Sequence, residues 1–382
     1  GDCHLKVKIN ELNLPVPTRV LYGRDLIDEL RTFFPATVRK VTIVIGKGSV
    51  RRSGLLDRIL TPLQKHGLET TVFEGVEENP SWATCLRGRD HLLRQATELI
   101  IALGGGSVLD AAKAMALAAT NTGSLAGMIE RRDYLQKPLP TMAIPTTAGT
   151  GSEVTQYCII TDETTHDKLN LHTPHSFPCT AILDPVCTLS MPRTITMGTG
   201  MDALSHAVEG YLSRRASSES DRLALESIEM IGKFLEASIR EPENLELREN
   251  MLLAATKAGA VISQAGTILL HALGYRLTLD HGVHHGLANA VLLYPFLLVT
   301  QRYKPQKVQG ILDALLGTHS TLEDLKGYLM RLGIKPDIGR CGVKPKDFEA
   351  IARYVLAKRN LPDTPFSVTS GDIFEILTLA MN

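Results

Sequence analysis

Residues 98–114 read ELIIALGGGSVLDAAKA, the most informative pattern in the first half of the chain. An aliphatic run stops at three glycines, and a helix-forming stretch follows them. The pattern predicts a buried β-strand, a tight turn and the first turn of a helix. Bare backbone and free N–H groups at the start of a helix favour a pyrophosphate. The candidate contacts are Gly104, Gly105, Gly106 and Ser107; the alternative is a tight turn without a ligand.

Other strands can be predicted on both sides of this stretch. Aliphatic or β-rich runs occupy residues 40–45, 70–73 and 141–144, most of them ending at glycine or proline and separated by helical patterns. Such runs are typical of parallel strands buried on both faces. From about Leu189 the periodicity is helical and strand signals nearly disappear. We therefore expect an α/β domain over residues 1–188 and an all-helical domain over residues 189–382, with a ligand cleft between them.

A second loop of small polar residues follows the run at 141–144. Residues 145–153 read PTTAGTGSE, which offers hydroxyl groups and bare backbone to a phosphate, a ribose or a nicotinamide amide. An ordinary threonine- and glycine-rich turn is the alternative, but two such loops at strand ends favour a dinucleotide site. Its candidate contacts are Thr146, Thr147, Thr150 and Ser152.

The loop after the run at 40–45 bears on the choice of dinucleotide. Residues 46–52 read GKGSVRR, with glycine where an NAD site usually has an acid for the ribose 2′-hydroxyl. Glycine leaves room for a 2′-phosphate and the basic residues supply charge, so Gly46, Gly48 and Ser49 predict NADP, with NAD the alternative. Arg51 and Arg52 could also be solvated residues at the start of a helix.

Four residues in the second half form a donor set for a divalent metal. Asp202 and His206 are four apart in a helical stretch and therefore lie on one face. His271 lies in residues 270–278, which look like the end of a helix, and His285 stands at the entry to the next helix after a turn that contains Gly282. One carboxylate and three imidazoles suit Zn²⁺ or Fe²⁺, and the donors alone do not choose between them. A single histidine is more often structural, but four together are harder to explain by packing.

Composition excludes several classes of function. The 382 residues contain 41 basic and 41 acidic side chains, a balance that predicts no nucleic-acid or membrane partner. The apolar runs are too short to span a bilayer, and no signal peptide is visible. The cysteines are scattered and form no C-x-x-C pair, which predicts buried or incidental thiols in a cytoplasmic protein. They are Cys3, Cys85, Cys158, Cys179, Cys187 and Cys341. For a protein of this size we expect a homodimer.

Taken together, these motifs resemble the iron-dependent (group III) alcohol dehydrogenases over nearly the whole chain. The matching segments are GGGS-x-x-D-x-x-K at 104–113, PTT-x-GTGSE at 145–153, Lys168 ahead of ILDP at 182–185, GMDAL-x-HA-x-E at 200–209, and the His271/His285 pair. The segment at 46–49 most resembles the NADP-dependent butanol dehydrogenase-like branch. The resemblance implies a dehydroquinate synthase-like fold and adds Asp110, Lys168 and Leu183 to the cofactor contacts.

The resemblance also implies an activity and a metal site. It implies Asp202, His206, His271 and His285 as ligands of one Fe²⁺ or Zn²⁺, and hydride transfer between NADP(H) and a small alcohol or aldehyde. Glycerol dehydrogenases and maleylacetate reductases share the plan and remain alternatives, as does a non-catalytic relative. Sugar-phosphate cyclases share it too, but the basic residues between positions 202 and 285 are few and scattered.

Two positions depart from the pattern of many members. Tyr275 stands where many have a histidine, and His284 stands where many have a proline. The first departure leaves His281 or the Tyr275 hydroxyl as the candidate proton relay. The second lets His284 compete with His285 as a ligand, and the spacing favours His285.

Overall fold

The computed structural model describes residues 7–381, which form two compact units. Unit 1 comprises the described residues up to Thr147 together with Ser152–Met191. Unit 2 comprises Ala148–Gly151 and the described residues from Pro192 onward. The boundary thus lies slightly later than the expected one after residue 188. The segment Ala148–Gly151 was expected in the first domain and groups with the second.

Unit 1 is built around one seven-stranded sheet with the strand order β1-β2-β9-β6-β5-β3-β4. Only β1 runs antiparallel to its neighbour; the other pairings are parallel. A separate antiparallel hairpin is formed by β7 and β8. The strands are β1 (Asn10–Leu12), β2 (Arg19–Tyr22), β3 (Lys40–Gly46), β4 (Glu69–Val76), β5 (Leu99–Gly104), β6 (Thr141–Pro145), β7 (Cys158–Asp162), β8 (Asp167–Leu171) and β9 (Thr180–Leu183).

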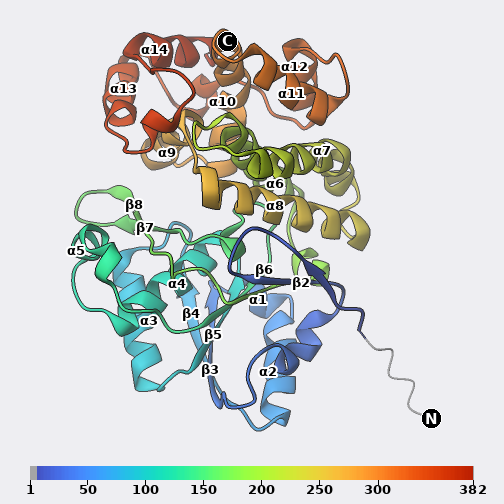
Figure 1. Ribbon diagram of the computed structural model, residues 1–382, viewed down its shortest axis with the longest axis vertical. Helices are drawn as coiled ribbons and strands as arrows, with labels where there is room; N and C mark the ends of the chain where they lie inside the picture. The colour runs from blue at the N-terminus through green and yellow to red at the C-terminus, as the bar shows by residue number, and fades with distance from the viewer. Residues whose placement is uncertain (1–6, 382) are drawn as a thin grey trace. The chain divides into compact units, whose positions relative to one another are not determined.

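Both faces of the sheet are covered, which explains the uninterrupted aliphatic runs. Alternate residues of β3 and β5, such as Ile43 and Ile101, pack with η1 (Leu26–Phe33) and α2 (Leu55–Lys65). Their neighbours Val44 and Ile100 point the other way and pack with α3 (Trp82–Arg94), α4 (Gly106–Thr120) and α5 (Leu125–Glu130). Figure 1 shows these helices around the strands of unit 1.

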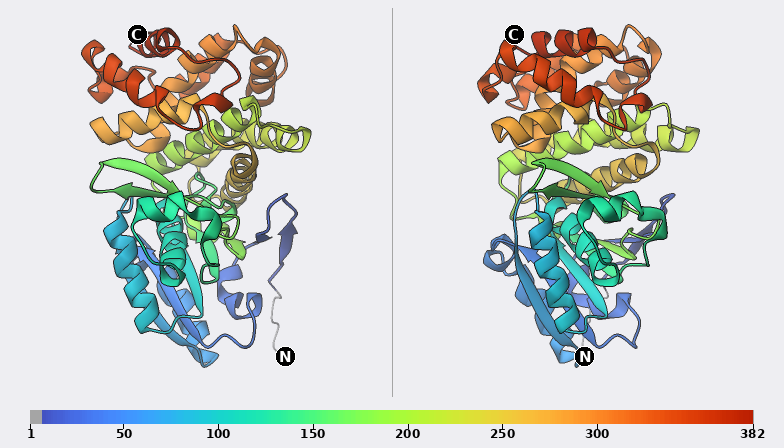
Figure 2. Two further views of the ribbon diagram at one scale, coloured as in Figure 1. Left: turned by 60° about the vertical axis from the view of Figure 1, so that its left-hand side comes forward. Right: turned by 90° about the vertical axis from the view of Figure 1, so that its left-hand side faces the viewer.

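Unit 2 contains no strand among its described residues (Figure 2). Its central helix, α6 (Arg193–Leu212), is buried on nearly all sides from Gly198 onward and packs against α7, α8 and α10. The other helices are α7 (Ser218–Arg240), α8 (Leu245–Ala265), α9 (Leu269–His281), α10 (His285–Thr300), α11 (Pro305–Leu316), α12 (Leu322–Arg331), α13 (Phe348–Leu356) and α14 (Ser370–Leu379).

The fold class expected from the sequence is confirmed, with a parallel-sheet unit followed by a helical one. Strands stand at all four expected positions, whereas the short β1, β2 and β7 to β9 were not predicted. Within residues 7–381 no single helix is long and apolar enough to cross a membrane; the bent pair α8 and α9 passes by length and composition alone. The five described cysteines are free, and Cys3 lies outside the described residues.

Candidate metal centre and nucleotide-binding loops

The four predicted metal ligands come from three helices of unit 2 and meet around one carboxylate oxygen. Asp202 Oδ1 lies 3.3 Å from His285 Nε2, 3.7 Å from His271 Nε2 and 3.8 Å from His206 Nε2. Two ligands bound tetrahedrally at roughly 2.1 Å from one metal stand about 3.4 Å apart. The observed spacing therefore fits a metal without rearrangement of the helices.

Three of these residues form the tightest group. One donor atom each from Asp202, His271 and His285 lies within 4.8 Å of the others. His206 borders this group: its ring stacks on that of His271, with centroids 4.7 Å apart. The structure thus brings all four predicted ligands together, three of them most closely.

Two glycines allow the helices to approach closely enough for this cluster. A Cβ on Gly286, the second residue of α10, would overlap the carbonyl oxygen of Gly198 on α6. The start of α10 therefore rests directly on α6, and His285 reaches Asp202. His284 instead caps α10 and lies over Gly198. This geometry favours His285 over His284 as the donor.

Burial and charge make the cluster electrostatically unusual. Asp202 is 3% exposed and His271 is 1% exposed. Burial opposes the charge on Asp202, but the facing His206, His285 and His271 hold the pKa of its carboxyl well below the usual range. Burial also opposes protonation of His271, yet Glu209 and Asp202 raise its pKa to about 9. Burial lowers the pKa of His206. Burial and the attraction between carboxylates and imidazoles therefore act against each other in this cluster.

Glu209 holds His271 in place and was not predicted as a functional residue. It is fully buried on α6, and its Oε2 hydrogen-bonds with His271 Nδ1. Its Oε1 accepts from the backbone N–H groups of Ile268, at 2.9 Å, and His271, at 3.1 Å. The carboxylate thereby pairs two backbone N–H groups at the start of α9 that the helix itself leaves without a partner, and it leaves Nε2 of His271 facing the cluster. Helical spacing was the available signal, since Asp202, His206 and Glu209 share one face of α6.

The two proton-relay candidates lie in different surroundings. The ring of Tyr275 stacks on that of His285, with centroids 5.1 Å apart, and meets His271 edge-on at 6.0 Å. His281 is the last residue of α9, and its Nδ1 faces Gly342. The structure therefore brings Tyr275 to the cluster, whereas His281 lies at the end of α9 beside Gly342.

The predicted dinucleotide loops gather at one edge of the sheet of unit 1. Gly46, Gly104, Pro145 and Leu183 end β3, β5, β6 and β9, which are adjacent and parallel. The order of strands reverses between β3 and β5, since β4 lies on one side of β3 and β5 on the other. Ligands of doubly wound sheets bind at the carboxyl ends of the strands at such a reversal. Gly104 to Ser107 and Gly46 to Ser49 flank it.

Close packing explains several glycines of these loops. A Cβ on Gly104 would overlap Val108, and one on Gly105 would crowd Thr147 at 3.3 Å. Thr146 N–H donates to the Gly104 carbonyl at 2.9 Å, which joins the first two loops. Thr150 lies in the short segment that groups with unit 2, where Gly151, at φ +65°, packs against Gly259. Part of the PTTAGTGSE motif thus serves packing in unit 2.

Asp110 and Ser152 are bonded to each other in unit 1. The Ser152 hydroxyl donates to Asp110 Oδ1, and Ile159 N–H donates to Oδ2 at 3.0 Å. Lys113, 2% exposed, donates to the carbonyls of Ser152 and Thr155 at 3.0 and 3.1 Å. This network fixes the loop after β6 to α4. Lys168 lies on β8 opposite Thr161.

Two basic residues near Gly46, Arg51 and Arg52, contact neighbouring residues of unit 1. Arg51 forms an ion pair with Glu74 of β4 at 2.8 Å, and Arg52 lies beside Gly48, whose φ is +92°. Ser49 begins the short helix α1 (Ser49–Arg52). An acid therefore does stand near the end of β3, supplied by the neighbouring strand.

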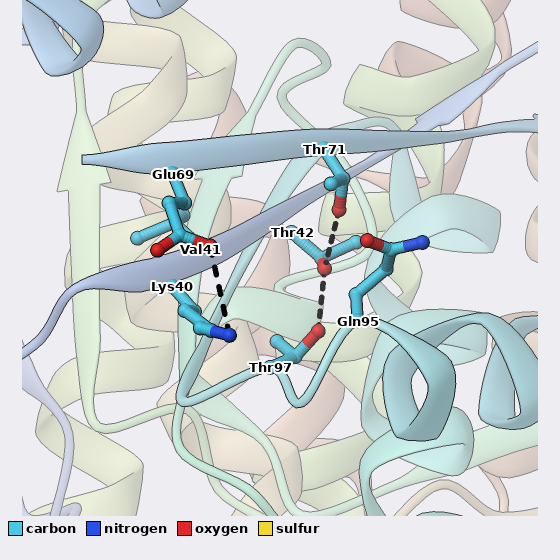
Figure 3. A pocket seen from close by; sticks show the side chains of 7 residues that line it. All are labelled: Lys40, Val41, Thr42, Glu69, Thr71, Gln95 and Thr97. Carbon is cyan, nitrogen blue, oxygen red and sulfur yellow. Dashed lines mark hydrogen bonds and ion pairs between the residues drawn. The ribbon is translucent and has the colours of Figure 1, made fainter.

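A polar recess lies at the opposite edge of the same sheet (Figure 3). Thr42 Oγ1 hydrogen-bonds with Thr71 at 2.9 Å and with Thr97 at 2.6 Å. Lys40 and Glu69, at the starts of β3 and β4, border it. Its position at the amino ends of the strands and its small size separate it from the nucleotide loops.

Comparison with known proteins agrees with this architecture. The model of the iron-containing alcohol dehydrogenases matches residues 17–185, and the model of the C-terminal region of the same family matches residues 196–381. Alcohol dehydrogenase 4 of Schizosaccharomyces pombe is 30% identical over 96% of this chain and 88% of its own length. The 1,3-propanediol dehydrogenase of Klebsiella pneumoniae is 34% identical over 90% of this chain and 91% of its own length.

A solved structure gives the same result. The iron-containing alcohol dehydrogenase of Thermotoga maritima superposes with a TM-score of 0.87 at 34% identity, covering 97% of this chain and 99% of that one. Family models spanning most of both units, together with these relatives, establish an oxidoreductase acting on CH–OH groups. The chain belongs to the iron-containing alcohol dehydrogenase family.

Proposed function

We propose that this protein interconverts a small alcohol and its aldehyde with NADP(H), using one divalent metal held by Asp202, His206, His271 and His285. The observation that carries the proposal is the convergence of four donors around Asp202 Oδ1 at 3.3 to 3.8 Å. Fe²⁺ and Zn²⁺ both suit this set of nitrogen and oxygen donors. When bound, the metal supplies a Lewis acid for the oxygen of the substrate.

The protein's own residues prepare the site for that chemistry. Glu209 hydrogen-bonds with Nδ1 of His271 and so leaves Nε2 as the ring atom that faces the cluster and would bind the metal. Burial of Asp202 and His271 removes competing water and strengthens each charge interaction. Asp202 stays ionised because the facing histidines lower the pKa of its carboxyl against the effect of burial. These residues bind and orient the metal.

For the dinucleotide we propose a site at the carboxyl ends of β3, β5, β6 and β9. Gly104 to Ser107 at the start of α4 suit the pyrophosphate, because the helix begins with unpaired N–H groups. Thr146, Thr147, Thr150, Ser152, Asp110, Lys168 and Leu183 complete the proposed contacts. NADP remains our preference because Gly46 leaves room for a 2′-phosphate, although the Arg51–Glu74 pair weakens that preference.

For proton transfer we propose the Tyr275 hydroxyl rather than His281. The Tyr275 ring touches His285 and His271, whereas His281 faces Gly342. Tyr275→Phe keeps the ring stacking and removes only the hydroxyl, so a lower kcat with unchanged metal content is expected. Equal kcat for Tyr275→Phe and a loss in His281→Ala would reverse the assignment.

The decisive experiment measures metal and turnover together. Purified protein is analysed for bound elements and assayed with NADPH and a panel of aldehydes, and with NADP⁺ and alcohols including 1,3-propanediol. His271→Ala should lose the bound metal and turnover, while Lys233→Ala, on the exposed side of α7, should keep both. Retention of metal and activity by His271→Ala would refute the ligand assignment. A homodimer is also proposed, and sedimentation of the purified protein tests it.

A further inference from the structure

Asn289 is a fully buried polar residue whose side chain contacts the proposed metal ligands. It follows His285 by four residues on α10, so the two side chains share one face of the helix. Its Nδ2 lies 3.3 Å from Asp202 Oδ1 and from His271 Nε2, and 3.4 Å from His285 Nε2. A single amide thus contacts three of the four proposed ligands.

The side chain of Asn289 is closely packed against α9. Its Oδ1 has no hydrogen-bond partner among the described residues and packs against Gly274 of α9, where a Cβ would overlap it. A buried carbonyl oxygen without a partner is costly. The amide group is therefore retained for the contacts of its nitrogen.

Chemistry determines which way the amide faces. Asp202 Oδ1 is an acceptor only, and a reversed amide would bring two oxygens together at 3.3 Å. The hydroxyl of Ser205, 3.4 Å from Nδ2, is a second acceptor, because its own hydrogen is donated to the Asp202 carbonyl at 2.7 Å. The two hydrogens of Nδ2 thus have two well-defined acceptors in Asp202 and Ser205.

We infer that Asn289 is a positioning residue of the metal centre. Its N–H fixes the rotation of the Asp202 carboxylate, so that Oδ1, the atom common to the three histidine contacts, stays at metal-binding distance. Without this bond the buried carboxylate can turn its oxygen away from the histidines. The inference rests on the proposed function, because it assumes that the cluster binds a metal.

Cobalt binding tests the inference without an activity assay. Co²⁺ affinity is measured by competition with a chelator, the visible spectrum of the Co²⁺ form reports the ligand geometry, and melting of the metal-free protein reports folding. Removing a group that orients a metal ligand typically weakens metal binding about 10- to 100-fold. We expect a loss of that size for Asn289→Ala, with altered cobalt bands, and less than about 3-fold for Ser205→Ala.

A matched control separates positioning from general loss of packing. Thr300→Val removes a buried polar group from the same helix, where the hydroxyl donates to the Phe296 carbonyl at 2.7 Å. This variant should melt earlier but keep the affinity and the spectrum. If Asn289→Ala does not fold, Asn289→Ser, whose shorter hydroxyl cannot reach Asp202, takes its place.

The outcomes distinguish the role of Asn289 from the proposed metal function. Wild-type affinity and bands in the Asn289 variant, or an equal loss in Thr300→Val, would overturn the role of Asn289 alone. If the wild-type protein binds no Co²⁺, or His271→Ala binds it equally well, the proposed metal function fails instead.

Discussion

The cluster of proposed metal ligands in unit 2 and the proposed nucleotide loops of unit 1 offer different groups for binding. The cluster uses side chains from α6, α9 and α10, and its members Asp202 and His271 are almost completely buried. The loops use backbone at strand ends, with Gly105, Gly106 and Ser107 partly exposed.

This difference has consequences for mutation. Side-chain donors depend on neighbouring residues for their orientation. Metal binding by the cluster should therefore be sensitive to substitution of residues that do not themselves bind the metal. Backbone N–H groups are the same in every residue except proline. Dinucleotide binding by the loops should therefore be sensitive chiefly to larger side chains that block access to the backbone. Variants that strike one region and spare the other are therefore the sharpest tests.

The largest indirect effect is expected from Glu209→Gln. The new amide can donate to His271 Nδ1, which would shift the imidazole proton to Nε2, the atom that faces the cluster. We expect metal affinity to fall about 10- to 100-fold while NADPH binding is unchanged. Chelator competition and NADPH fluorescence titration measure the two.

A matched control for this variant is Glu226→Gln. Glu226 pairs with Lys257 and Arg222 on the surface of unit 2, away from the cluster. Equal metal affinities for wild type, Glu209→Gln and Glu226→Gln would show that side-chain orientation does not govern this site.

The opposite pattern is expected from Gly105→Val. The branched side chain would crowd Thr147 and cover the start of α4, so NADPH affinity should drop roughly 10-fold or more as the helix N-terminus becomes inaccessible. Bound metal, measured by elemental analysis, should remain at the wild-type level. Loss of metal in this variant would contradict the independence of the two regions.

Acidity should affect metal binding through His271. The pKa of His271 is raised to about 9 in the metal-free protein, chiefly by Glu209 against the effect of burial. Below that pH a metal must displace the proton, so affinity should fall about 10-fold per pH unit as pH decreases. Co²⁺ titrations at several pH values between 6.5 and 9 test this dependence, and a flat profile would contradict it.

The same proton also affects folding of the metal-free protein, with the opposite sign. A histidine whose pKa is higher in the folded state contributes its full stability below the unfolded value, about 6.5. That contribution is lost as pH rises through about 9. Melting of the metal-free protein between these limits should therefore occur at lower temperature as pH increases, and His271→Ala should lack this trend.

The smallest effect is expected at the ion pair between Arg51 and Glu74. Glu74→Gln releases Arg51, so the ratio of kcat/KM with NADPH to that with NADH should rise about 2- to 5-fold, in keeping with the modest strength of exposed ion pairs. Arg51→Ala should lower the same ratio. A preference for NADH in the wild-type protein would show that Gly46 alone does not select NADP.

Much of the fold could be predicted because buried parallel strands leave a strong local signal. The runs ending at Gly46, Gly104 and Pro145 are aliphatic on both faces, and the sheet does cover both. The short β1, β2 and β9 escaped prediction because three or four residues carry too little periodicity. Their pairing is set by long-range contacts, such as that of β2 with β9.

The donor set, the glycine loops and the family could be predicted from the sequence, because residue type and spacing are local properties. The side chains that support those donors become visible only once the helices are packed together. Glu209 and Asn289 become part of the cluster because α6, α9 and α10 converge, which Gly198, Gly274 and Gly286 allow. The physical reason is that a hydrogen bond between distant segments depends on how helices pack, and a single segment does not encode that distance.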